Sequence, residues 1–180
     1  MAVNQFNLNA GQRAERKLLI TVVEWQEMVG TTLTPVREIL GTRTEDSSIE
    51  YNADIETTTD IRGINYTDVN RTQPQQAFDP FLVLGGSKLG ALLNDIRRRN
   101  AVSELNQFNL YVITAFIGTT GAYEAERHSN CTISYDSFGG DSNVNFPITV
   151  YYSNDWNGSG KPQTGTVNKL SDDFEFTADV

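Results

Sequence analysis

The longest period-two alternation in the chain covers residues 43–63, and it restricts what this region can fold into. From residue 49 to residue 62, its odd positions hold apolar residues and threonines, and its even positions hold charged and polar side chains. Such alternation is typical of a β-strand with one buried face. At about 3.3 Å per residue, the strand would extend over roughly 45 Å across these residues. We therefore predict a long strand whose apolar face packs on the core and whose other face is acidic.

A second alternating segment occupies residues 165–180. Phenylalanine, alanine and valine alternate there with aspartate, glutamate and threonine. The sequence thus predicts two strands that each present an acidic face. The carboxylates singled out on these faces are Glu50, Asp54, Glu56, Asp173 and Glu175.

The other apolar segments also favour strands. Residues 17–29 fit a helical face as well as a strand, but their β-branched run favours the strand. Residues 105–117 are apolar on both faces in their second half, which indicates a strand covered by a helix on one side and core on the other. Two further strands are expected at residues 131–136 and 144–152. We therefore predict a mainly β fold.

One helix is expected, at residues 87–100. Ser87 is a suitable N-cap, and the apolar residues recur at i, i+3, i+4 and i+7, namely Leu89, Leu92, Leu93 and Ile96. Arg97, Arg98 and Arg99 fall at the negative end of the helix dipole. The three arginines fit a solvated helix end, a nucleic-acid contact or an ion pair with an adjacent subunit.

Two segments are expected to lie outside the regular structure. Residues 1–16 are polar and fit either an N-terminal arm that orders against a neighbour or a frayed terminus. Residues 17–180 then form a single domain. Within it, residues 64–80 predict an extended loop, and Asn70 and Pro74 of this loop would contact another subunit.

Charge and composition restrict the function classes. The 180 residues carry a formal net charge of −9, which argues against a duplex-binding surface built on phosphate neutralisation. The absence of a long apolar run and of a signal-like start gives the expectation of no export and no membrane anchor. Cys131 is the single cysteine, so an intrachain disulfide is excluded and a small apolar filler is expected.

The sequence offers little for catalysis. His128 is the single histidine, so a Ser-His-Asp or Cys-His arrangement is not available within the chain, and His128 is expected at the surface. Its acidic neighbours and Cys131 match no standard zinc spacing, so we expect no metal. The carboxylates of the alternating segment are interpreted as a charged face. We expect neither an enzyme nor a cofactor.

Several segments carry a family resemblance. RTEDSSIEYNADIETTTDIRG, FDPFLVLGGSKL, RRRNAVSELNQFNLYV, GTVNKL and the final DDFEFTAD resemble segments of the major tail (tail tube) proteins of long-tailed phages that infect Gram-positive bacteria. The resemblance covers residues 38–180, and residues 45–52 are its most specific part. Residues 1–37 resemble no known segment.

The resemblance implies a β-sandwich or barrel of the tail tube type with a flanking helix. It further implies hexameric rings that stack into a tube in the virion tail, after assembly in the host cytoplasm. The implied partners are copies of the chain, a tape-measure protein, tail terminator and distal tail proteins and tail assembly chaperones. DNA would pass without specific binding, since a like-charged wall disfavours its adhesion. The five carboxylates named above would line the lumen.

Three alternatives remain open at this point. The first is the tube of a contractile tail or a phage-like bacteriocin, which would share the fold. The second is a β-sandwich carbohydrate-binding module, with Trp25, Trp156 and the tyrosines as a stacking platform. The third is a hydrolase that uses the carboxylates.

Overall fold

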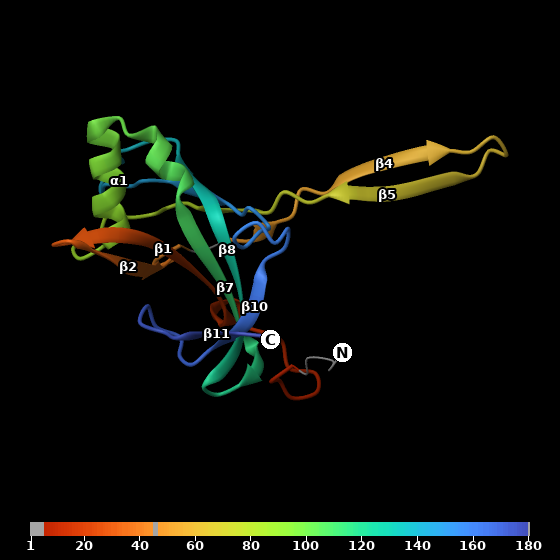
Figure 1. Ribbon diagram of the computed structural model, residues 1–180, viewed down its shortest axis with the longest axis horizontal. Helices are drawn as coiled ribbons and strands as arrows, with labels where there is room; N and C mark the ends of the chain where they lie inside the picture. Colours follow the sequence, from red (N-terminus) through yellow and green to blue (C-terminus); the bar gives the residue numbers. More distant parts are fainter. Residues whose placement is uncertain (1–5, 45–46, 180) are drawn as a thin grey trace.

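A computed structural model describes residues 6–44 and 47–179, without the side chain of Arg71. Over these residues the fold is mainly β with one flanking α-helix, as predicted, and its sandwich-like sheet is not closed into a barrel (Figure 1). Its elements are the 3-10 helices Arg16–Leu18 and Val102–Asn106, the helix α1 (Lys88–Arg99), and the strands β1 (Leu19–Val29), β2 (Thr32–Ile39), β3 (Ile49–Glu50), β4 (Asp54–Thr59), β5 (Asn65–Arg71), β6 (Gln75–Phe78), β7 (Phe108–Thr119), β8 (Ala122–Tyr135), β9 (Ile148–Tyr151), β10 (Gln163–Val167) and β11 (Phe176–Ala178).

The main sheet is antiparallel and runs β2-β1-β7-β8-β9-β6-β3, with β10 paired to β8 and β11 paired to β10. The 14-residue strand β8 joins its two parts, because its first half pairs with β10 and its last residues pair with β9. At Gly165 in β10, an added Cβ would lie 2.3 Å from the carbonyl oxygen of Thr177. A glycine at this position therefore allows β11 to approach closely.

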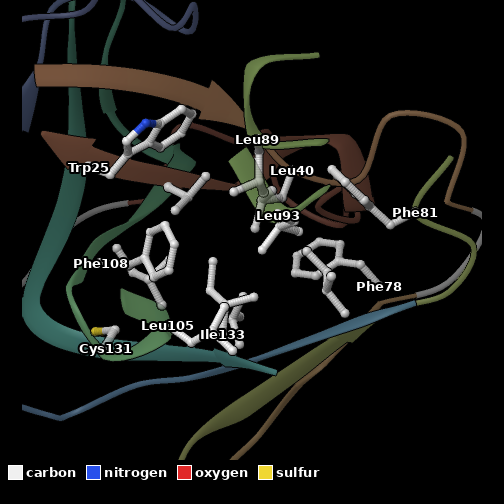
Figure 2. Close-up of a cluster of buried hydrophobic side chains, with 14 of the residues drawn as sticks. Trp25, Leu40, Phe78, Phe81, Leu89, Leu93, Leu105, Phe108, Cys131 and Ile133 are labelled. Carbon is white, nitrogen blue, oxygen red and sulfur yellow. The ribbon is translucent and has the colours of Figure 1, made fainter. Parts of the chain in front are cut away.

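The larger core lies between β1, β7 and β8 on one side and β6, β9 and α1 on the other (Figure 2). Trp25 and Phe108 pack edge to face, with ring centroids 6.5 Å apart. Leu89 and Leu93 extend from the helix into the same cluster. The helix therefore closes the core.

A smaller core covers the opposite face of the sheet. Val22, Tyr111 and Ile113 pack there against Val167 of β10 and Phe174 of the C-terminal segment. Successive residues of β7 thus belong to different cores, since Leu110 and Val112 lie in the larger one. This arrangement confirms the predicted strand with both faces covered, and 3-10 helix Val102–Asn106 precedes it.

The helix was predicted correctly, with both of its ends. Ser87 Oγ accepts a hydrogen bond from the backbone N–H of Gly90 at 3.0 Å, which is an N-cap. Glu38 of β2 adds a second cap, because its Oε2 accepts from the N–H groups of Lys88 and Leu89 at 2.7 and 2.8 Å. Asn100 ends the helix in the left-handed conformation. The signals at Ser87 and Asn100 are local in sequence, whereas the cap from Glu38 comes from the distant strand β2.

The prediction of one long strand over residues 43–63 was wrong. The segment contains the two-residue β3 and the separate β4. Ile49 of β3 packs against the larger core, whereas Tyr51, Ile55 and Ile61 are exposed. The strand is interrupted at residues 51–53, where Asn52 has a φ of 41°, and the chain reverses at Asp60–Gly63, where Asp60 Oδ1 accepts from the N–H groups of Arg62 and Ile64. Glu45 and Asp46, part of the most specific segment of the resemblance, lie outside the described residues.

The predicted extended loop at residues 64–80 was also wrong. It contains β5, which pairs with β4, and β6, which pairs with β9 and β3. Asparagine, aspartate and proline lowered the strand propensity of this segment, but cross-strand pairing overrides such propensities. The strand predicted at residues 17–29 is confirmed as β1. Of the predicted N-terminal arm, Phe6 pairs with Ile117, and residues 1–5 lie outside the described part.

Candidate functional site

The feature that distinguishes this chain is the arm formed by β4 and β5. The two strands form a sheet of their own, and Figure 1 shows it projecting far from the body. Residues 51–59 and 61–70 are all exposed. A two-stranded hairpin without cover is at best marginally stable in water. The arm therefore lacks the packing that normally holds such a structure in place.

The two faces of the arm differ in chemistry. On one face Ile55 pairs with Val69 and Thr57 with Thr67, so this face is uncharged. Ile55 and Val69 are 60% and 61% exposed. The other face carries Glu56 opposite Asp68 and is acidic. The uncharged face is thus suited to burial and the acidic face to solvent.

The tip of the arm presents an apolar side chain on an ordered turn. Ile61 is 106% exposed, the highest exposure among the large apolar side chains described. Asp60 holds the turn, and its hydrogen bond from the N–H of Ile64 is the main cause that lowers the pKa of this carboxyl. Gly63 has a φ of 78°, which a residue with a side chain rarely adopts.

The predicted lumen-lining carboxylates form two separate groups in the folded chain. Glu50 lies in β3 and accepts from Gln75 Nε2 at 3.3 Å, and Asp54 and Glu56 lie in the arm. Asp173 and Glu175 precede β11, which lies on the body away from the arm (Figure 1). A hydrogen bond from Lys169 is the first cause that lowers the pKa of Asp173. The fold of a single chain does not bring the two groups together.

The three helix-end arginines have different surroundings. Arg99 donates to Asp95 and to Glu104, both at 2.7 Å, so its guanidinium is engaged within the chain. The guanidinium of Arg97 lies 4.3 Å from the ring centroid of Phe138. Arg98 is exposed.

The two loop residues predicted to contact another subunit also differ. Asn70 lies on the arm, where its Nδ2 donates to Glu56 Oε2 at 3.2 Å. Pro74 is buried within the chain, and its carbonyl accepts from the N–H of Tyr152 at 2.9 Å. The ring of Pro74 is therefore not part of the surface.

Glu24 is a buried charged residue that the sequence did not single out. Its carboxylate accepts from Arg37 Nε at 2.6 Å, from Asn109 Nδ2 at 3.0 Å and from the Tyr111 hydroxyl at 3.3 Å. Arg37 also donates to the carbonyl of Phe174 at 2.6 Å. The one available signal was a glutamate inside the apolar run of β1. This hydrogen-bond network links the C-terminal segment to strands β1, β2 and β7 of the sheet.

Residues considered for catalysis or ligand stacking are mostly buried. His128 is 4% exposed, so its predicted surface position was wrong, and burial lowers its pKa to about 4. Cys131 is fully buried among apolar side chains, as predicted for a filler. Trp25 is 5% exposed, which leaves no stacking platform at that residue. Trp156 stacks instead on Arg127, whose guanidinium lies 3.6 Å from the ring centroid.

Comparisons with protein-family models, curated proteins and solved structures gave no match. Within residues 6–44 and 47–179, histidine, cysteine and carboxylate side chains form no group of three or more that could hold a metal ion. The helices of this part of the chain are too short or too polar to cross a membrane.

Proposed function

We propose that the protein is a structural subunit that assembles with copies of itself, and that the assembly is the tail tube of a long-tailed phage. The single observation that carries the self-assembly is the β4–β5 arm. The function needs no catalytic group, because its working parts are surfaces.

The arm supports assembly through its exposed apolar face. Ile55, Val69 and Ile61 are 60%, 61% and 106% exposed on a two-stranded hairpin that is only marginally stable without cover. Burial on a neighbouring subunit would remove this area from water at roughly 25 cal/mol per Å². A hairpin that is weak alone would then be held by its partner. The acidic face would remain in solvent.

The tail tube is the form of assembly that the resemblance favours. In hexameric rings stacked into a tube, arms that leave the body can bridge from one subunit to another. The proposal for the lumen lining rests on charge. It assigns this role to five carboxylates of a chain with net charge −9, namely Glu50, Asp54, Glu56, Asp173 and Glu175. Because they form two groups in one subunit, a continuous acidic wall requires several subunits to contribute.

Negative-stain electron microscopy of the purified protein tests this proposal. Rings or tubes of uniform diameter are expected, together with a sedimenting species much larger than the 20.0 kDa monomer. A chain that stays monomeric at all concentrations, and also when the tape-measure protein and chaperones encoded by the same genome are added, would contradict it.

A further inference from the structure

A surface groove beside α1 is the concave apolar site that complements the arm tip. It has a volume of about 490 Å³ and is lined by Val83, Ala91, Phe138 and Val144 among others. Val83, Phe138 and Val144 are 41%, 44% and 46% exposed, so their side chains present apolar surface to solvent. Ala91 is small and exposed, which leaves the groove open along the helix. A single branched side chain is of a size that this groove can hold.

The charges around the groove complement those of the arm. Arg43 lines the groove, and the guanidinium of Arg97 stacks on Phe138 at its wall. Residues 51–71 of the arm contain four acidic and two basic residues, a net charge of −2. Two copies of a chain with net charge −9 repel each other in general. An acidic segment therefore approaches a second copy most favourably where arginines are exposed.

The arm cannot reach the groove of its own subunit. Figure 1 shows α1 on one side of the body and the arm extending from the opposite side. A contact between them must therefore join two copies. Such a contact is head-to-tail, because one copy contributes its arm tip and the other copy contributes its α1 groove. Contacts of this kind repeat into closed rings or open helical filaments.

We infer that the arm tip of one copy docks in the α1 groove of a second copy, with Ile61 inserted between Val83, Phe138 and Val144. This inference rests on the proposed self-assembly and names the surface that receives the arm. In the docked state the arm, with its net charge of −2, approaches Arg43 and Arg97, while its acidic face stays in solvent. The occupant is a second copy of this chain.

The main competing surface is the tip of the β1–β2 hairpin. Met28, Val29 and Leu33 are 60–64% exposed there. The hairpin tip would contact Ile61 from one side only. In the groove, residues on several sides would contact Ile61. Leu33 thus provides a control position of similar chemistry outside the groove.

Disulfide trapping between full-length chains tests the inference. Cys131 is buried, and burial raises the pKa of its thiol, so introduced cysteines at exposed sites react selectively. Ile61→Cys chains are mixed with tagged Ala91→Cys chains under mild oxidation, and in parallel with tagged Leu33→Cys chains. All three introduced positions are exposed, and thermal unfolding of each variant verifies its fold.

Docking in the groove predicts that the 61–91 heterodimer forms at least about tenfold faster than the 61–33 heterodimer, because docking raises the effective concentration of the two thiols. Adding Arg43→Glu to the Ala91→Cys chain should slow this reaction in low salt but not in high salt. Equal rates for both pairs, or faster trapping at Leu33, would overturn the inference. Tubes seen by microscopy with equal trapping rates would leave the proposed function standing and reject the groove alone.

Discussion

Arg37 Nε donates to Glu24 Oε2 across the β1–β2 pair at 2.6 Å, and the two side chains are only 21% and 7% exposed. Because Arg37 also contacts the ring of Phe174 at 4.3 Å and its carbonyl at 2.6 Å, the pair connects the sheet edge to the C-terminal segment. Removal of one partner leaves a buried charge without compensation.

Arg37→Met should therefore lower the free energy of unfolding by about 3–5 kcal/mol. Urea denaturation measures the loss, and faster amide exchange is expected at residues 168–178. The double variant Glu24→Gln/Arg37→Met should regain part of the stability. Lys169→Met breaks an exposed ion pair and serves as the control, with little change expected. An Arg37→Met variant as stable as the control would contradict the assigned role.

Glu38 is expected to stabilise α1 from outside the helix. Glu38→Ala removes the acceptor for the N–H groups of Lys88 and Leu89, so a loss of about 1–2 kcal/mol in the free energy of unfolding is predicted. Glu38→Gln keeps one oxygen acceptor and should lose less. Chemical denaturation monitored by far-ultraviolet circular dichroism distinguishes the variants. Equal stability of the alanine and wild-type chains would show that Ser87 alone caps the helix.

His128 should make the fold sensitive to acid. Burial lowers its pKa from 6.5 to about 4 in the folded state, so the unfolded chain binds the proton more readily. The stability contributed by the neutral ring is complete above pH 6.5 and is lost as the pH falls towards 4. Between pH 6.5 and pH 5 the predicted loss is about 1–2 kcal/mol. Glu126 Oε2, 4.0 Å from His128 Nε2, moderates the loss by attracting a protonated ring.

The comparison with His128→Leu isolates this effect. Exposed carboxyl groups titrate equally in both chains, so the difference between their stability profiles belongs to position 128. The wild-type profile should fall more steeply than the variant profile between pH 6.5 and pH 5. Parallel profiles would contradict the prediction.

The proposed lumen lining predicts a defect in genome delivery. Phages carrying Glu56→Lys or Glu175→Lys should assemble tails but eject DNA more slowly, because a basic wall attracts the phosphate backbone. Receptor-triggered ejection, followed by a DNA-binding dye, measures the rate. Asp136→Lys adds the same charge at an exposed site outside both carboxylate groups and is the control. Ejection at the wild-type rate in both lining variants would refute the lining.

Local signals made some elements predictable. The Leu89–Leu93–Ile96 periodicity and the Ser87 cap specify α1 within one segment of sequence. The arm was not predictable in this way, because Ile55 on an exposed hairpin has the same alternation as a buried strand. Which face is buried depends on the strand's partners, and these are set by tertiary structure. Glu24 was missed for the same reason, since its partners come from β2 and β7.

The central claim is that the uncharged face of the arm drives self-assembly. Ile55→Asp/Val69→Asp places two charges on that face, whereas Val102→Asp changes an apolar residue of similar exposure, 56%, outside the arm.

Sedimentation velocity of the wild-type chain and both variants at matched concentrations tests the claim most directly. Large species are predicted for the wild-type and Val102→Asp chains, and a folded monomer of about 20.0 kDa for the arm variant. Assembly of the arm variant at the wild-type concentration would contradict the account.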